Sequence, residues 1–261
     1  MTFLDRRTVL RAAAAGALVG PGAVAGCGRA DGPVGAKAAA PSGRAAPTTA
    51  PASPLPPLPA GLPAQIEHGP RTGDGVALTF HGNGDPRTAT DQLAEAERAG
   101  ARLTVLAVGE WLDAHPRLAR RILDGGHELG NHTMRHLDIC SMDAADARAE
   151  ITECADRLRR LTGGIGRWFR PSRARFATEQ VAELARRAGY PHVLSYDVDS
   201  LDFTDPGAEE VRRTVMGAVR PGSVVSLHFG HAGTVAALPA ILDGLHRRGL
   251  RAVTTTELLT R

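Results

Sequence analysis

The pattern of hydrophobic and polar positions divides the chain near residue 65. Beyond that point, short runs of aliphatic and β-branched residues alternate with longer stretches in which apolar side chains recur at helical spacing. Strands followed regularly by helices are typical of a parallel sheet with helices packed outside it. The pattern therefore predicts an α/β domain over residues 65–261, whose sheet is either open or closed into a barrel.

The periodicities also place the individual elements. The predicted strands cover residues 76–80, 103–108, 128–131, 168–170, 192–196, 223–227 and 251–253. The predicted helices cover residues 89–99, 116–124, 143–161, 178–188, 208–219 and 235–248.

Polar residues at the ends of these strands suggest one shared site. His81, His132, Arg170, Asp199 and His228 each stand at or just beyond the end of a predicted strand. In α/β barrels, active sites are built on the face formed by the carboxyl ends of the strands. We therefore expect these side chains to converge.

Two of the histidines have a spacing that suits a metal ion. His132 and His136 lie four residues apart, on a turn that follows the strand at 128–131. Imidazoles at that spacing fall on one side of a helical turn, where both can reach one cation. The spacing alone also fits surface or capping histidines, so the surrounding motifs decide between the two interpretations.

The segment before the domain looks like an export signal. Arg6 and Arg7, followed by the apolar run at 12–19, resemble a twin-arginine signal, and residues 24–27 resemble a lipobox that ends at Cys27. The apolar run is shorter than the roughly 20 residues that a transmembrane helix needs. We therefore expect a lipoprotein whose lipid, on Cys27, anchors it to the cell membrane and leaves the domain on the extracellular side.

In this interpretation residues 1–27 are the lipoprotein signal, and a soluble secreted protein cut near Ala25 is the alternative. Residues 28–64 consist largely of Ala, Pro, Gly, Ser and Thr. Such a stretch cannot bury enough apolar surface to fold, and predicts a disordered tether.

Composition adds limits on partners and on covalent links. The 261 residues carry 43% hydrophobic and 23% charged side chains, and the formal net charge is +3. Basic residues are spread along helices and form no blocks, which argues against nucleic acid as a partner. We also expect a monomer.

Cys154 lies about 16 Å along its predicted helix, so a disulfide with Cys140 is not expected unless the loop before the helix folds back.

Four motifs follow one another in a recognisable order. They are His132-Thr133-Met134-Arg135-His136, Phe169-Arg170-Pro171, Asp199-Ser200-Leu201-Asp202-Phe203, and Leu227-His228. Together they resemble the H-[ST]-x-x-H, arginine, D-S-x-D-W and L-H motifs of NodB-type polysaccharide deacetylases, carbohydrate esterase family four. The resemblance covers about residues 76–259 and implies a deformed (β/α) barrel of parallel strands with outer helices.

The first motif departs from the family pattern. The family usually has T-F-D-D-G-P, in which the first Asp is the catalytic base and the second is a metal ligand; here His81 and Gly82 occupy those places. Asp85 lies in the following Gly-rich loop, which is flexible enough to turn back toward the metal. Asp85 therefore either replaces the lost ligand, with His81 as base, or caps the next helix, in which case His81 completes a three-histidine site.

Other positions depart as well. Ser172 and Arg173 stand where the family tends to have a proline and an aromatic residue, and Phe203 stands for the usual tryptophan. Substrate preference therefore does not carry over from the resemblance.

The resemblance implies metal-assisted hydrolysis of an acetyl group on a sugar. His132 and His136, with Asp85 or His81, would hold a divalent cation, most simply zinc, with cobalt or nickel open. His81 would act as base and His228 as acid, with Asp199 orienting the His228 ring. Arg170 would brace the base in the family, and here would pair with Asp85 or Asp199, or contact the substrate.

The resemblance and the export signal together predict an N- or O-deacetylase acting on a cell-envelope or other extracellular polysaccharide. Two alternatives remain open. One is a catalytically silent lipoprotein that binds glycans, since both carboxylates are missing. The other is a hydrolase of a different non-peptide C–N bond on the same fold.

Overall fold

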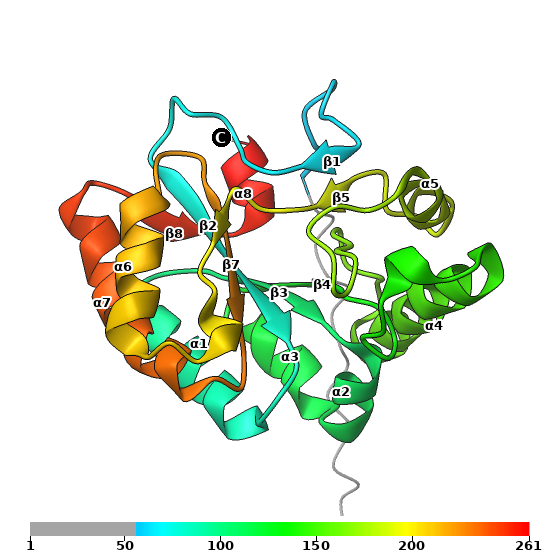
Figure 1. Ribbon diagram of the computed structural model, residues 1–261, viewed down its shortest axis with the longest axis horizontal. Helices are drawn as coiled ribbons and strands as arrows, with labels where there is room; N and C mark the ends of the chain where they lie inside the picture. Colours follow the sequence, from blue (N-terminus) through cyan, green and yellow to red (C-terminus); the bar gives the residue numbers. More distant parts are fainter. Residues whose placement is uncertain (1–55, 261) are drawn as a thin grey trace, which may run out of the picture. The chain divides into compact units, whose positions relative to one another are not determined.

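The computed structural model describes residues 56–260 (Figure 1). The predicted signal at 1–27, its Cys27 and most of the tether lie outside the described residues. Within the described range, no helix combines the length and the apolar character that crossing a membrane requires.

A parallel sheet forms the centre of the domain. Its strands run in the order β4 (Glu128–Asn131), β3 (Thr104–Ala107), β2 (Gly75–Gly82), β7 (Val224–His228) and β6 (Val198–Asp199), and β8 (Arg251–Val253) pairs with the first part of β2. A smaller parallel pair joins β1 (Gln65–Ile66) to β5 (Val193–Leu194). The predicted parallel α/β architecture is confirmed.

The strands curve round toward a deformed barrel. Beyond β4, Phe169 forms single bridges to Asn131 on one side and to Val193 on the other. Only three residues then separate β5 from β6, which pairs with β7 at the opposite edge of the sheet. The segment predicted as a strand over 168–170 is therefore a one-residue link in this wall.

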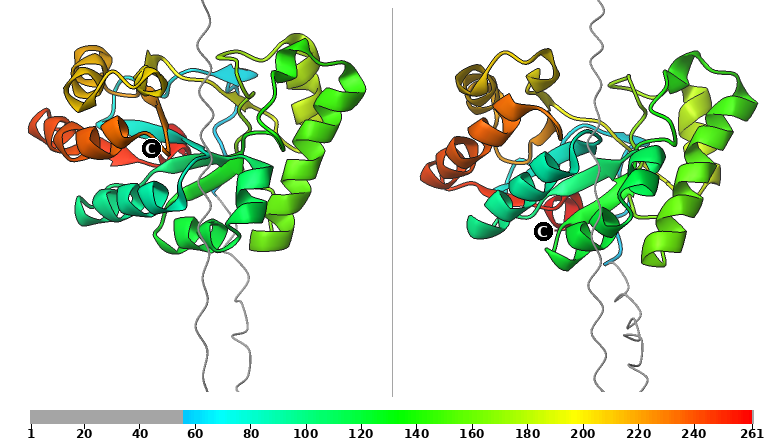
Figure 2. Two further views of the ribbon diagram at one scale, coloured as in Figure 1. Left: turned by 60° about the horizontal axis from the view of Figure 1, so that its bottom comes forward. Right: turned by 90° about the horizontal axis from the view of Figure 1, so that it is seen from below.

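Helices cover the outside of the strands (Figures 1 and 2). They are α1 (Pro86–Arg98), α2 (Gly109–Ala114), α3 (Arg117–Asp124), α4 (Ala144–Thr162), α5 (Glu179–Arg187), α6 (Ala208–Ala218), α7 (Ala232–Arg247) and α8 (Thr255–Thr260), with 3-10 turns η1 (Ile139–Ser141) and η2 (Asp202–Thr204). Every predicted helix is present, and α2 and α8 were not predicted. Side chains that cap the amino end explain where several helices begin. For example, Asp143 accepts hydrogen bonds from Ala145 N and Asp146 N at the start of α4.

The packed part of the chain begins before residue 65. Leu58 and Leu62 pack against the core cluster that contains Ile66 and Trp168, and Pro63 O receives a hydrogen bond from the ring of His192 at 2.8 Å. Residues 56–64, which the sequence analysis assigned to the tether, therefore belong structurally to the domain.

The inward faces of the strands change from apolar to polar along the barrel. On β2, Val76, Leu78 and Phe80 face the outer core beneath the helices, while Ala77 joins the inner cluster at the amino ends of the strands. Because side chains alternate along a strand, Thr79 and His81 continue the inner row. The polar end of that row opens at the carboxyl ends of the strands, where the site lies.

Candidate metal and catalytic site

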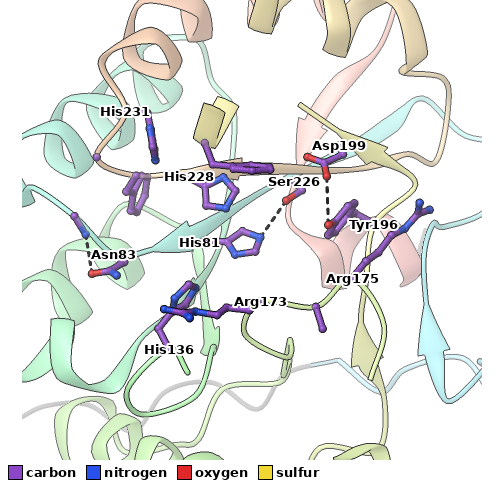
Figure 3. A pocket seen from close by; sticks show the side chains of 15 residues that line it. His81, Asn83, His136, Arg173, Arg175, Tyr196, Asp199, Ser226, His228 and His231 are labelled. Carbon is purple, nitrogen blue, oxygen red and sulfur yellow. Dashed lines mark hydrogen bonds between the residues drawn. The ribbon is translucent and has the colours of Figure 1, made fainter. Parts of the chain in front are cut away.

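The site begins where β2 and β7 lie side by side. Their parallel register pairs His81 with His228, and the two rings stack with centroids 4.2 Å apart. Figure 3 shows both imidazoles directed into the same pocket. The predicted convergence of these two strand ends is thus present in the structure.

His132 and His136 are held by a bend instead of the helical turn that their spacing suggested. Thr133 and His136 both have left-handed backbone conformations, with φ of 68° and 58°. Side-chain hydrogen bonds fix the bend, because Asn131 Oδ1 accepts from Thr133 N at 2.9 Å and Thr133 Oγ1 accepts from His136 N at 3.2 Å. Such conformations cost about 1 kcal/mol or more each and concentrate at functional sites.

Three imidazoles meet at one point. His81, His132 and His136 each offer a ring nitrogen, and these atoms all lie within 4.8 Å of one another; Nδ1 of His81 is 2.8 Å from Nε2 of His132. Burial, followed by the charge of a neighbouring imidazole, holds the pKa of His81 and of His132 well below the ordinary value. Neutral imidazoles keep lone pairs available, and this is the form that binds metal ions.

Hydrogen bonds behind the rings select the nitrogens that face this point. His132 Nδ1 donates to Arg170 O at 3.0 Å, which leaves Nε2 with a lone pair. His81 Nε2 lies 3.0 Å from Ser226 Oγ and can donate to it, which leaves Nδ1 as the second donor atom. Metal-ligating histidines are commonly oriented by partners of this kind. In this tautomer, His81 Nδ1 and His132 Nε2, together with the ring nitrogen that His136 offers, fit a divalent cation such as zinc.

Arg170 lies beneath the histidines without a carboxylate partner among the described residues. Its Nε donates to Leu194 O and one terminal nitrogen to Ser195 O, both at 2.9 Å; the other lies 3.3 Å from His81 Nε2. Burial lowers the pKa of the guanidinium to about 10. Arg170 thus reaches the position that was predicted for it but pairs with neither Asp85 nor Asp199.

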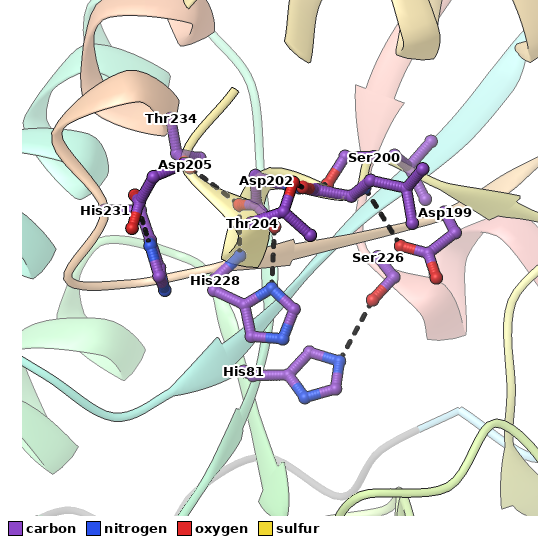
Figure 4. Close-up of polar contacts among 12 residues, drawn as sticks. His81, Asp199, Ser200, Asp202, Thr204, Asp205, Ser226, His228, His231 and Thr234 are labelled. Carbon is purple, nitrogen blue, oxygen red and sulfur yellow. Dashed lines mark hydrogen bonds and ion pairs between the residues drawn. The ribbon is translucent and has the colours of Figure 1, made fainter. Parts of the chain in front are cut away.

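His228 forms a tight pair with Asp202, as Figure 4 shows. His228 Nδ1 donates to Asp202 Oδ1 at 2.7 Å, while Asp202 Oδ2 accepts from His228 N at 2.8 Å and from Thr234 Oγ1 at 2.6 Å. Burial opposes ionisation of this carboxyl, but the hydrogen bonds from His228 and Thr234 hold its pKa below the ordinary value. His228 therefore presents Nε2 to the pocket with its orientation fixed.

The orienting role predicted for Asp199 is therefore wrong in its geometry. Asp199 Oδ1 accepts from Leu201 N at 3.1 Å, and Oδ2 accepts from Tyr196 Oη at 3.4 Å. The loop after β6 turns through the left-handed Leu201, which directs the second aspartate of the motif, and not the first, toward His228.

Asp85 is placed at the start of α1. Its carboxylate accepts from Arg87 N at 2.8 Å, and Pro86 follows as the first helical residue. The side chain is exposed, and the three-histidine group does not include it. Of the two arrangements left open by the sequence, the structure has Asp85 as the helix cap and His81 in the three-histidine group.

The backbone of β2 at Gly82 lies close to β3. A Cβ there would meet Ala107 Cα at 2.9 Å and Val105 Cγ1 at 3.0 Å. A larger side chain cannot enter unless β3 moves.

The cleft above these residues has a volume of about 560 Å³. Its rim includes Arg173, Arg175, Tyr196, Phe203 and His231. His231 pairs with the exposed Asp205 at 2.8 Å, and the ring of Phe203 meets His228 edge-on with centroids 5.6 Å apart. The dimensions suit a ligand of the size of one or a few sugar rings.

Sequence reasoning missed several residues of this site. Asp202 belongs to the D-S-x-D-W-like motif, but its spacing from His228 in the sequence gives no sign that the two side chains are in contact. Ser226 lies two residues before His228 on β7, so period-two alternation could have placed it on the inner face. Tyr196 and Arg173 follow irregular backbone, where sequence periodicity gives no direction.

The sequence is similar to those of known proteins. The polysaccharide deacetylase family model matches residues 68–193. A peptidoglycan-N-acetylglucosamine deacetylase of Bacillus cereus is 33% identical over 190 residues, which cover 70% of this chain and 87% of the relative. A chitooligosaccharide deacetylase of Bradyrhizobium sp. is 28% identical over 197 residues, covering 67% and 85%.

Solved structures give the same fold. The chain resembles a peptidoglycan N-acetylglucosamine deacetylase with a TM-score of 0.71 and 26% identity, over 75% of this chain and 92% of the other. It also resembles a CE4 family pseudoenzyme from Bacillus anthracis with a TM-score of 0.71 and 24% identity, over 76% and 69%.

Proposed function

The chain belongs to the polysaccharide deacetylase family, and on this premise we propose that it is a metal-dependent hydrolase that removes acetyl groups from a glycan. His81, His132 and His136 would hold the metal ion. The observation that carries the proposal is the convergence of three imidazoles, each with one ring nitrogen within 4.8 Å of the others, two of which, His81 and His136, line the cleft. The relatives that release acetyl groups from peptidoglycan or chitooligosaccharides support the same class of substrate.

A divalent cation bound there would supply polarisation of the acetyl carbonyl and a lowered pKa for water. The chain's own residues would move the protons. His228 Nε2, fixed by the bond from Nδ1 to Asp202, would take a proton from water as the hydroxide oxygen bonds to the acetyl carbon. The same nitrogen would return the proton to the leaving amine or alkoxide as its bond to that carbon breaks, and acetate would be released.

One imidazole then serves as base and as acid, in contrast to the predicted division between His81 and His228. The reason is geometric, because His81 Nδ1 lies 2.8 Å from His132 Nε2 and so occupies a ligand position. Asp202 would stabilise the imidazolium that forms between the two transfers.

The location of the substrate rests on the sequence of the first 64 residues. A twin-arginine signal, a lipidated Cys27 and a tether would place the domain outside the cell membrane, within reach of envelope polymers. We propose such a polymer as the substrate, with either an N-acetyl or an O-acetyl group as the bond cleaved.

A second candidate, a catalytically silent glycan-binding lipoprotein, is favoured by one specific contact. Arg170 lies 3.3 Å from His81 Nε2 and would donate to a lone pair on that nitrogen. In that tautomer His81 carries its proton on Nδ1 and donates to His132 Nε2, so both nitrogens are engaged and the metal position is closed.

Two measurements on the purified full-length chain separate these candidates. The first is metal content after incubation with zinc and removal of the excess. The second is release of acetate from a chitin hexamer and from peptidoglycan glycan strands. His132→Ala should lose the metal, whereas His231→Ala, which changes a rim histidine outside the donor group, should keep it.

Stoichiometric zinc that depends on His132, together with acetate release, would support the hydrolase. Zinc without acetate release from either glycan would favour the silent binder with a metal site. A chain that takes up no zinc would contradict the metal-dependent mechanism.

A further inference from the structure

One wall of the cleft carries a cation, Arg173, that has no ion-pair partner among the residues that the structure describes. Arg173 lines the cleft beside His136, and Figure 3 shows the two side chains next to each other. The side chain of Arg173 is exposed, and it makes no hydrogen bond or ion pair with the residues that the structure describes. Its charge is close enough to contribute to the lowered pKa of His136, after the larger effect of burial.

The backbone holds Arg173 at this position with some strain. Arg173 has a φ of 57°, in the left-handed region that non-glycine residues rarely adopt. The preceding Ser172 is buried and bonded on two sides, since its hydroxyl receives a hydrogen bond from Thr133 Oγ1 at 3.0 Å and donates to Leu137 O. Arg173 is therefore tied to the same bend that carries His132 and His136.

The other charged groups of the cleft differ from Arg173. Arg175 is occupied, because it pairs with Glu67 at 3.1 Å and its guanidinium lies 5.0 Å from the ring centre of Phe176. Asp199 lies on the far side of His81 from Arg173 in Figure 3, where Leu201 N and Tyr196 Oη donate to it. Among residues 56–260, no carboxylate therefore pairs with Arg173.

Apolar side chains also lie at or near the rim of the cleft. The exposed large hydrophobic residues of the described chain are Leu137, Phe176, Leu201 and Phe203, with exposed fractions of 42–50%. Each lies in the lining of the cleft or within two residues of a lining residue. Aromatic and aliphatic surfaces around a polar cleft fit the apolar faces of sugar rings, so an extended glycan suits this mouth.

We propose that Arg173 binds an anionic substituent, a carboxylate or a phosphate, of the glycan chain, so that the preferred ligand is an acidic acetylated glycan. A guanidinium matches either anion with two parallel hydrogen bonds. Arg173 is a specificity-determining residue in this proposal, which deepens the proposed function and rests on its glycan-binding cleft.

The test is equilibrium binding to the full-length chain, measured by calorimetry and independent of turnover. One pair of probes is a peptidoglycan glycan strand, which carries carboxylates, and the same strand with its carboxyls reduced to alcohols. The second pair is a phosphate-bearing N-acetylglucosamine polymer and its dephosphorylated form. We expect the anionic member of at least one pair to bind about tenfold more tightly, and the pair that responds identifies the anion.

Arg173→Gln should abolish that preference while the affinity for the neutral member is unchanged. Arg175→Gln is the matched control, because it removes a cation from the same rim that already has a carboxylate partner, and it should keep the preference. Raised salt should weaken only the anionic probe.

Equal affinity for both members of both pairs would overturn the proposal, and so would a preference that survives in Arg173→Gln. Binding to no glycan at all would overturn it together with the proposed function. Binding with the expected preference but no release of acetate would support the role of Arg173 and contradict only the hydrolase.

Discussion

Asp202→Asn is the substitution that most directly tests the proposed acid–base chemistry. Asp202 is 1% exposed, and its two oxygens accept three hydrogen bonds, two of them at Oδ2. An asparagine keeps most of these bonds if its oxygen replaces Oδ2 and receives the bonds from His228 N and Thr234 Oγ1. Its amide nitrogen then replaces Oδ1 and points a donor at His228 Nδ1.

This arrangement inverts the tautomer of His228. A neutral imidazole that accepts at Nδ1 must carry its proton on Nε2, so the nitrogen facing the cleft has no lone pair with which to take a proton from water. Positioned proton transfer contributes about 10²–10⁴-fold to rates. We therefore expect kcat for acetate release to fall by that factor, equivalent to about 2.7–5.4 kcal/mol of activation free energy, with little change in KM.

The tautomer can be read without turnover, from the ¹⁵N chemical shifts of the His228 ring. Asp205→Asn provides a matched control, because it makes the same chemical change on an exposed aspartate that pairs with His231 at the rim, and exposed ion pairs contribute little. The reasoning would be refuted if Asp202→Asn kept wild-type kcat, or if Asp199→Asn and not Asp202→Asn changed the tautomer of His228.

Three further predictions concern stability. Gly82→Ala should lower the free energy of unfolding by about 1–3 kcal/mol, because the new Cβ meets the β3 backbone at 2.9 Å; Gly164→Ala, where a Cβ meets nothing within 4 Å, should change urea unfolding little. Asp85→Ala should lower the free energy of unfolding by about 1 kcal/mol, because the helix cap is lost, and should leave the metal content unchanged. Loss of the metal in this variant would show instead that Asp85 is a metal ligand. His127 accepts from Leu103 N at Nδ1, and burial, partly offset by Glu97, lowers its pKa in the folded state. The unfolded chain therefore binds the proton more readily, so stability should fall as pH drops through about 6.5. His127→Gln should make that part of the urea-derived pH profile less steep but not flat, because burial also lowers the pKa of His81, His132 and His136; an unchanged slope would contradict the assignment.

The parts of the fold that sequence predicted well are those with strong periodicity. Helix α4 runs over Ala144–Thr162, close to the predicted 143–161, because its apolar stripe and its capping residue give the same start. Strand β2 carries a continuous apolar run that can only be buried on both faces. Short elements escaped prediction, since β1 and β6 have two residues each and owe their pairing to neighbours distant in sequence.

The site residues, too, were predicted well where they lie at the ends of regular strands and poorly elsewhere. Residues at strand ends could be placed at one face from the order of elements alone, which is why His81, His132, Arg170 and His228 were found together. The hydrogen bonds between these side chains and their partners depend on the left-handed backbone conformations of Thr133, His136 and Leu201. Sequence periodicity does not predict such conformations. For this reason the sequence could name both aspartates of one motif but not the one that reaches His228.

The substitutions at the start of the site change its charge as well as its shape. In the T-F-D-D-G-P pattern that residues 79–86 resemble, two carboxylates stand where this chain has His81 and Gly82, so relative to that pattern the chain has two fewer negative charges near the buried Arg170. Less negative charge should weaken the binding of a cation, but it should favour a negative charge that develops on the acetyl oxygen and any anion carried by the glycan. Arg173 adds a further positive charge at the edge of the same cleft. Such a site should bind a metal ion more weakly and anionic ligands more strongly than a site with two carboxylates. The two effects can be measured separately, as the zinc dissociation constant and as the preference between the charged and neutral glycan probes.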